Sequence, residues 1–256
     1  FRVAISDLAA MGAEPLCCTL ALSLPNVDHP WLGEFSEGLH ESAARFACPL
    51  VGGDTVRGPL SISLQMQGTV PKGKALKRSG AKVGDEVYVS GVLGDGAAAL
   101  AVLSDAMADN SKTRPYFFTR YYQPQPQLAL GQALRGLASA AIDISDGLVG
   151  DLGHICRASG VGAVLDVSAL PISLSAQSRA DIAQQRQWAL YGGDDYELCF
   201  TVPQSKRDQL AQVAQTLALH VTPIGRIVEG AGLVDAASGE PLSLGGYNHF
   251  NQDDSL

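Results

Sequence analysis

The sequence contains 256 residues, of which 46% are hydrophobic and 17% charged, and its formal net charge is −8. This composition predicts a chain with a buried core and excludes a largely disordered protein. The negative charge argues against a nucleic acid as the main partner. Since no run of about 18 apolar residues occurs, we expect no membrane span.

The five cysteines predict a reducing environment. Their number is odd, no C-x-x-C occurs, and several lie in apolar runs. We therefore expect buried, reduced thiols in a cytoplasmic protein. The chain begins with Phe1, on an apolar helical stripe without a preceding cap, so we expect a fragment of a longer protein.

Hydrophobic periodicity predicts a helix and strand order for the first 70 residues. The expected elements are a helix over 1–13 that ends at Gly12, strands over 15–24, 50–55 and 60–70, and a helix over 31–47. Residues 71–85 are rich in lysine, arginine and glycine, which indicates a linker. A solvated loop and a phosphate-facing arm explain this basic cluster equally well. We place the domain boundary here, with domains over 1–71 and 72–256.

The second part also alternates between strands and helices. The expected strands cover 86–92, 140–142, 162–167, 198–202, 221–227 and 233–234, and the expected helices cover 94–107, 125–138, 145 onward, 176–190 and 205–217. Several strands alternate between apolar and polar residues, which is untypical of a fully buried parallel sheet. The pattern predicts an α/β protein with mixed α+β layers in two domains.

Four short acidic motifs share one pattern, an aspartate beside small residues at the edge of an element. They lie at residues 6–8, 52–55, 143–146 and 192–195. Carboxylate and hydroxyl oxygens are the ligands that Mg²⁺ prefers, and glycine allows close approach of a ligand. Because no zinc pattern, nucleophile elbow or Walker A motif occurs, the motifs favour a metal–nucleotide enzyme.

Residues 142–151 are the most informative of these stretches. A strand ends near Ile142, and apolar residues at helical spacing follow from Leu148, so Ser145 or Asp146 is expected at the helix N-cap. Capping explains one carboxylate but not two that lie three residues apart, which predicts a Mg²⁺ and phosphate site. The alternative is a capping box with a solvated aspartate. We expect Asp151 to be a solvated helix position.

These motifs, together with residues 246–250 at the end of the chain, resemble the thiamine-monophosphate kinase family of the aminoimidazole ribonucleotide synthetase superfamily. The resemblance covers the whole chain, and its motifs occur in the family's order. It implies an N-terminal domain that pairs with its copy in a homodimer, followed by an α/β C-terminal domain. It also implies an enzyme that uses ATP and Mg²⁺ to convert thiamine monophosphate to thiamine diphosphate.

The resemblance also implies roles for single residues. Asp7, Asp54, Asp143 and Asp146 would be Mg²⁺ ligands at the ATP phosphates, Gly53 and Ser145 would contact the nucleotide, Arg78 would reach its phosphates, and Asp194 and Tyr247 would contact the substrate. Asp194 stands where the family usually has a glutamate. Family members also have an upstream segment with Gly-Asp-Asp and Ser-Thr-Asp motifs and a substrate-contacting histidine. Since this sequence lacks that segment, we expect the 256 residues alone to be poorly active.

The acceptor implied by the resemblance is already an anionic phosphate, so the reaction needs no strong general base. We expect direct γ-phosphoryl transfer without a phosphoenzyme. Two alternatives remain. One is another superfamily member, which activates an amide or formyl oxygen with ATP. The other is a non-catalytic nucleotide-binding or metal-storing protein.

Overall fold

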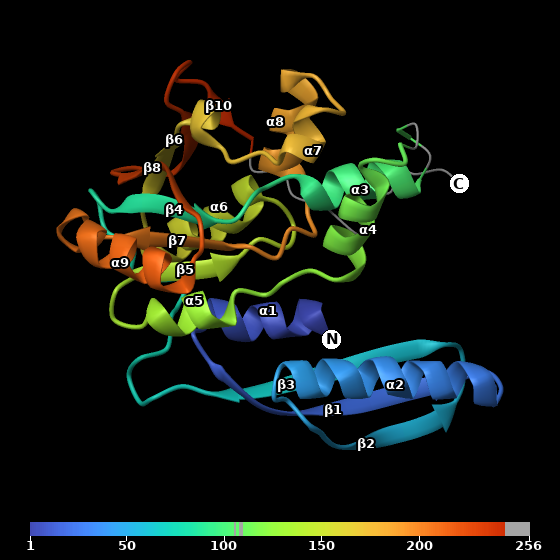
Figure 1. Cartoon of the computed structure of the whole chain (residues 1–256). Helices are drawn as coiled ribbons and strands as arrows, with labels where there is room; N and C mark the ends of the chain where they lie inside the picture. Colours follow the sequence, from blue (N-terminus) through green and yellow to red (C-terminus); the bar gives the residue numbers. More distant parts are fainter. Residues whose placement is uncertain (105, 108–109, 244–256) are drawn as a thin grey trace.

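The computed structural model describes residues 1–104, 106–107 and 110–243 and contains two β-sheets (Figure 1). The first sheet has three strands in the order β2-β1-β3, and the second has seven in the order β10-β9-β6-β8-β4-β7-β5. Within the described chain, no helix is both long and apolar enough to cross a membrane. The mixed two-sheet architecture confirms the predicted fold class.

The three-stranded sheet is formed by the first 70 residues. Its strands are β1 (Glu14–Leu24), β2 (Leu50–Arg57) and β3 (Ser61–Thr69), and α2 (His29–Arg45) connects β1 to β2. β1 pairs in parallel with β2 and antiparallel with β3, so that Leu20 lies opposite Gly53 and Leu64. Asp28 caps α2 by accepting a hydrogen bond from the backbone of Trp31 at 3.1 Å.

The seven-stranded sheet follows residues 71–85, which form an irregular connection as predicted. Its strands are β4 (Glu86–Ser90), β5 (Ala140–Asp143), β6 (Gly162–Leu165), β7 (Leu198–Val202), β8 (Val221–Val228), β9 (Gly232–Asp235) and β10 (Pro241–Leu242). All neighbours pair antiparallel except β6 and β9. β4 and β7 are buried along their whole length, which explains their apolar composition.

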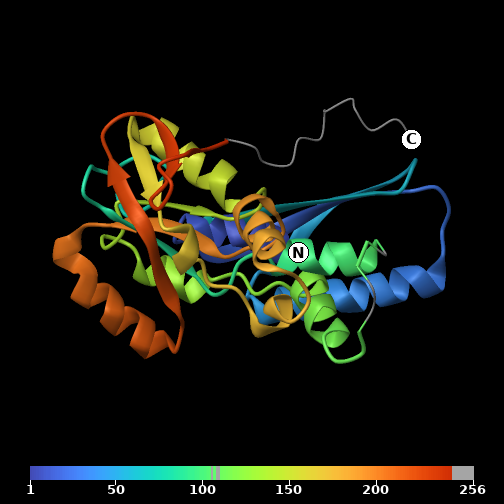
Figure 2. The same cartoon turned by 90° about the horizontal axis from the view of Figure 1, so that it is seen from above.

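Helices cover both faces of this sheet (Figures 1 and 2). The helices of the described chain after α2 are α3 (Asp95–Leu103), α4 (Arg114–Tyr122), α5 (Leu128–Ala133), α6 (Leu148–Ser159), α7 (Leu174–Gln177), α8 (Ile182–Tyr191) and α9 (Arg207–Leu217). Val87 and Val89 pack toward α6, whereas Tyr88, between them, packs with residues of α5 and α9. This alternation along β4 shows that both faces of the sheet are buried.

The first helix, α1 (Arg2–Ala10), lies between the two sheets (Figure 1). It contacts β3 of the small sheet and both β5 and α5 of the larger part. Arg135 Nε donates a hydrogen bond to the carbonyl oxygen of Gly12 at 2.5 Å, which fixes the end of α1 against the segment after α5. Gly12 itself has φ +64° and ends the helix as predicted. Because α1 contacts both the small sheet and the larger part, these contacts do not divide the chain into two separate units. The predicted domain boundary at residue 71 therefore stays a prediction.

Several predicted boundaries were wrong in detail. The helix expected from Ser145 begins at Leu148, with Gly147 at the N-cap. The helix expected over 176–190 is divided into α7 and α8, because Asp181 starts a new helix by accepting a hydrogen bond from the backbone of Gln184. α4 was not predicted at all, and α5 is shorter than the expected 125–138. The cysteines are free, as expected, and all but Cys17 are buried.

The contact between α1 and α5 gives a prediction about stability. A Cβ atom built at Gly131 would overlap the carbonyl oxygen of Ala9, so the two helices approach as closely as glycine permits. We expect Gly131→Ala to lower the free energy of unfolding by about 1–3 kcal/mol, the usual effect of overpacking. Gly38→Ala in α2 is the control, because nothing lies within 4 Å of its Cβ position. It should raise stability by about 0.5–1 kcal/mol. Denaturant unfolding measures both, and an unchanged midpoint for Gly131→Ala would contradict the packing argument.

Candidate active site

Two predicted aspartates, Asp7 and Asp143, meet in one cleft. Asp7 comes from α1 and Asp143 ends β5, while Lys77 and Arg78 contribute from the basic connection between the sheets. The cleft has a volume of about 280 Å³. A hydrogen bond of 2.9 Å from the backbone N–H of Ala141 to the carbonyl oxygen of Lys77 holds the connection beside β5. The sequence separates these three groups by up to 136 positions, and α1, β5 and the connection bring them together.

The carboxyl group of Asp143 is 6% exposed. Burial raises its pKa, and the nearby Asp7 raises it further, while Ser6 and Arg78 act in the opposite direction. Burial also raises the pKa of Asp7, against the Arg78 charge. Ser6 is fully buried, and its hydroxyl lies near enough to Asp143 to lower the pKa of that carboxyl. The cleft therefore presents two carboxylates that would be stabilised by a cation, with the Ser6 hydroxyl beside Asp143.

This donor chemistry fits Mg²⁺, which prefers oxygen ligands. The described residues nevertheless contain no group of three or more acidic, histidine or cysteine side chains placed to hold a metal ion. The lining of the cleft includes neither Asp54 nor Asp146. Asp54 is exposed on β2, opposite Ala21 of β1, and Gly53 precedes it with φ +146°. The set of four aspartate ligands therefore stays a prediction. Two of its members, Asp7 and Asp143, share a cleft.

Asp146 and Ser145 lie in the loop that connects β5 to α6. Asp151, in the first turn of α6, accepts hydrogen bonds from the backbone N–H groups of Ser145 at 3.0 Å and Asp146 at 3.1 Å. Asp151 is only 3% exposed, and burial raises its pKa to about 6. The prediction that Asp151 is a solvated helix position was therefore wrong. Its carboxylate folds back from the helix and shapes the loop that carries Asp146.

A second loop, residues 192–197, lies directly against the first. The backbone N–H groups of Ile144, Asp194 and Tyr196 donate to the carbonyl oxygens of Glu197, Ser145 and Ile144 at 2.8, 3.0 and 2.9 Å. A Cβ atom at Gly193 would overlap the carbonyl oxygen of Ser145, so this contact requires glycine. The two acidic motifs, about 50 residues apart in sequence, thus form one continuous surface.

Asp194 is half-buried in this second loop and has φ +65°. Tyr196 Oη donates a hydrogen bond of 2.7 Å to Asp194 Oδ1. On α4, Tyr121 lies near enough for Asp194 to raise its pKa, although burial is the larger cause. Tyr247, the other residue predicted to contact substrate, lies outside the described residues. Of the two residues predicted to contact substrate, the described chain thus includes Asp194, with Tyr121 and Tyr196 near it.

The second loop is also fixed to the start of α3. Asp195, which is 1% exposed, accepts hydrogen bonds from the backbone of Gly94 at 2.7 Å and of Gly96 at 3.1 Å. The N-terminus of α3 thus holds this carboxylate through backbone N–H groups. Burial raises the pKa of Asp195 to about 7, against the effect of the two N–H groups and Arg120.

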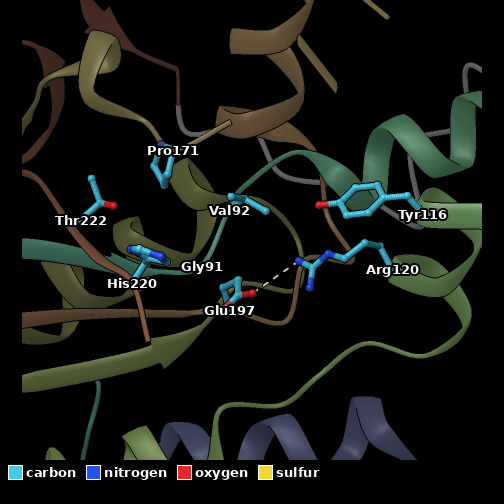
Figure 3. A pocket seen from close by; sticks show the side chains of 8 residues that line it. All are labelled: Gly91, Val92, Tyr116, Arg120, Pro171, Glu197, His220 and Thr222. Atoms are coloured by element: carbon cyan, nitrogen blue, oxygen red, sulfur yellow. Dashed lines mark hydrogen bonds and ion pairs between the residues drawn. The ribbon is translucent and has the colours of Figure 1, made fainter. Parts of the chain in front are cut away.

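Arg120 of α4 extends toward Glu197 on the other side of the loop, in a separate pocket of about 390 Å³ (Figure 3). Its Nη2 lies 3.4 Å from Glu197 Oε1, and its Nε lies 3.4 Å from Asp95 Oδ2. Glu197 also accepts hydrogen bonds from Ser90 at 2.6 Å and Gln127 at 2.9 Å. Arg120 thus partly neutralises the buried carboxylates behind the loop.

Sequence reasoning missed this supporting set, namely Asp95, Arg120, Asp195, Tyr196 and Glu197. The signal for Asp195 was present, because it belongs to the acidic motif at residues 192–195, and Tyr196 and Glu197 follow that motif directly. Nothing in the local sequence identified Arg120 as their partner, because α4 lacks a clear apolar period and was not predicted. One signal for the start of this helix was present, since Pro115 lies in its first turn, where proline is common.

The buried Asp195 gives a prediction about pH. Its folded-state pKa of about 7 exceeds the usual unfolded value, so between about pH 4 and 7 the folded state binds more protons. The contribution of Asp195 to stability therefore falls as pH rises across this window. We expect the free energy of unfolding of the wild type to fall relative to that of Asp195→Asn between pH 4 and 7.

Denaturant unfolding at several pH values measures this difference. The control is Asp208→Asn in α9, an exposed position, which should follow the wild-type pH dependence. A constant difference between wild type and Asp195→Asn across the window would show that Asp195 does not titrate there.

Comparison with known proteins agrees with the predicted family. The N-terminal domain of AIR synthase related proteins matches residues 1–70, and the C-terminal domain of the same family matches residues 82–236. Thiamine-monophosphate kinase of Salmonella typhimurium is 49% identical over 252 residues, which cover 97% of this chain and 78% of the relative.

Solved structures give the same result. The crystal structure of thiamine-monophosphate kinase from Stenotrophomonas maltophilia K279a has a TM-score of 0.87 and 44% identity, covering 94% of this chain and 78% of that one. AaThiL complexed with AMPPCP and TMP has a TM-score of 0.85 and 29% identity, covering 97% and 78%. The chain belongs to the thiamine-monophosphate kinase family, within the AIR synthase related proteins.

Proposed function

We propose that this protein transfers the γ-phosphoryl group of ATP to thiamine monophosphate and so forms thiamine diphosphate. Family membership supports this activity, and AaThiL has been solved with AMPPCP and TMP. The observation in this chain that carries the proposal is the joining of residues 143–146 to residues 192–197 by three backbone hydrogen bonds. This contact supports the proposal, because it joins the loop of Asp143 and Asp146, which would serve the nucleotide, to the loop of Asp194, which would serve the acceptor.

The site needs few bases, because the acceptor phosphate is anionic near neutral pH. The main barrier is the repulsion between two polyanions, which positioning and positive charge reduce. Arg78 lines the cleft with Asp7 and Asp143 and would contact the phosphates. Asp7 and Asp143, with Asp54 and Asp146, would hold Mg²⁺, which supplies charge neutralisation when bound. Transfer is direct, without a phosphoenzyme.

The experiment measures ADP release from ATP and Mg²⁺, with and without thiamine monophosphate, on protein whose intact mass is known. We expect release that depends on thiamine monophosphate, and no labelled phosphate trapped on the protein. Asp146→Asn should lower turnover at least about tenfold with an unchanged unfolding midpoint, because Asp146 is exposed in its loop. The control Asp208→Asn should retain wild-type turnover.

Three results would contradict the proposal. Nucleotide binding without turnover would favour a binding protein, and ATP hydrolysis that depends on an amide or formyl substrate would favour another member of the superfamily. If Asp146→Asn only unfolds the protein, the aspartate acts as a structural cap.

We also propose that the protein is a cytoplasmic homodimer. The free cysteines support a reducing compartment. Around the three-stranded sheet, several large apolar side chains are exposed, namely Leu16, Leu50, Val51, Val56, Leu60 and Ile62. All eight residues of β2, one of the two edge strands of the described sheet, are exposed as well. An apolar sheet surface with an open edge is typical of an interface between subunits.

Light scattering coupled to size-exclusion chromatography tests the dimer. We expect twice the chain mass for the wild type, and a shift toward monomer for Val51→Lys, because a charge would be buried in the interface. Val51 is 63% exposed, and the control Val83→Lys, 54% exposed outside the small sheet, should remain dimeric. A wild type that is monomeric and fully active would disprove the homodimer.

A further inference from the structure

Tyr196 is a buried tyrosine that the mechanism above does not use. It lies two residues after Asp194 and is 8% exposed. Its Oη donates a hydrogen bond to Asp194 Oδ1 at 2.7 Å, in the loop that faces residues 143–146. One oxygen of the Asp194 carboxylate is therefore already engaged, and no hydrogen bond from a described residue occupies the other.

The backbone holds this pair in an uncommon conformation. Asp194 has φ +65° and Tyr196 has φ +53°, both in the left-handed region, which tyrosine rarely adopts. The hydrogen bonds from the N–H groups of Asp194 and Tyr196 to Ser145 and Ile144 fix this conformation. Between the two residues, Asp195 is anchored at the start of α3. The surrounding structure therefore determines how the side chains at 194 and 196 meet.

The groups around the phenol of Tyr196 decide what its hydroxyl can do. Besides burial, the groups that act on its pKa are Asp194, Asp143 and Tyr121. Burial raises its pKa, and the hydrogen bond to Asp194 and the charge of Asp143 raise it further. The hydroxyl keeps its single proton and donates it to Asp194, so this proton is not available to the substrate.

We propose that Tyr196 is a positioning residue, which orients the carboxylate of Asp194 toward the acceptor substrate. The proposal rests on the proposed function and deepens it, because it names the residue that prepares the acceptor side of the site. Orientation matters here, since aspartate is one methylene shorter than the glutamate that the family resemblance leads us to expect. The shorter aspartate side chain has fewer ways to reach the substrate than glutamate would have. The hydrogen bond from Tyr196 therefore has more influence on the direction of the Asp194 carboxylate.

The test compares Tyr196→Phe with the wild type in steady-state kinetics. Loss of a hydrogen bond to a charged group should raise KM for thiamine monophosphate about tenfold. KM for ATP should change less than twofold, because the nucleotide-side contacts remain. The matched control is Tyr88→Phe. Tyr88 is 4% exposed and donates a hydrogen bond of the same length, 2.7 Å, to Glu86, also two residues earlier, in the core of the large sheet. Tyr88→Phe should leave both KM values unchanged.

A double-mutant cycle separates positioning from general structure. If Tyr196 acts through Asp194, adding Tyr196→Phe to Asp194→Asn should have no further effect on KM for thiamine monophosphate. Equal increases in both backgrounds would overturn the proposal, as would a parallel increase in KM for ATP or an unchanged KM in Tyr196→Phe.

A structure of the wild-type protein with thiamine monophosphate provides a measurement that does not depend on whether the variants fold. We expect Tyr196 Oη to remain on Asp194 while the other carboxylate oxygen contacts the substrate. A Tyr196 hydroxyl bonded to the substrate instead would overturn the proposal. Failure of the proposed function would look different, because the wild type itself would then release no ADP in response to thiamine monophosphate.

Discussion

The site depends on the antiparallel pairing of β5 with β7. Asp143, the last residue of β5, lies opposite Leu198, the first residue of β7. Because the strands run in opposite directions, the loop that leaves β5 and the loop that enters β7 emerge at the same place. The backbone hydrogen bonds between residues 144–145 and 194–197 continue this pairing beyond the sheet. The acidic motifs at residues 143–146 and 192–195 are thus joined by main-chain contacts, so that this pairing does not occupy their aspartate side chains.

The acidic residues of these loops have two different tasks. Asp7 and Asp143 face a cleft, and Asp194 is half-buried at the surface of its loop. Asp151 and Asp195 point inward and accept hydrogen bonds from backbone N–H groups, much as a helix cap does. A buried carboxylate is costly unless hydrogen bonds or a counter-charge compensate it. The N–H groups meet this requirement in the described loops, with Arg120 contributing near Asp195 and Glu197.

The sequence predicted much of the fold because local patterns determine it. The alternation of Ile62, Leu64 and Met66 identified β3, and the glycine at position 12 identified the end of α1. Strand order, by contrast, depends on contacts far apart in the chain, so the position of β4 between β7 and β8 had no local signal. The burial of Asp151 was missed for a different reason. Its helical spacing was recognised, but its partners lie in the loop before the helix.

The position of α1 has a consequence for the aperture of the cleft. Asp7 lies on α1, whereas Asp143 lies on β5, and α1 rests on α5 at a contact where Gly131 meets the carbonyl of Ala9. Helix separation depends on the side chains at the crossing. The spacing of two carboxylates, one on a helix and one on a strand, therefore depends on a position in α5 that carries only a hydrogen atom. A methyl group at position 131 would push α1 away from α5 and so change the distance between Asp7 and Asp143, although neither Gly131 nor Ala9 lines the cleft. Selection on the geometry of the cleft would therefore also act on this glycine.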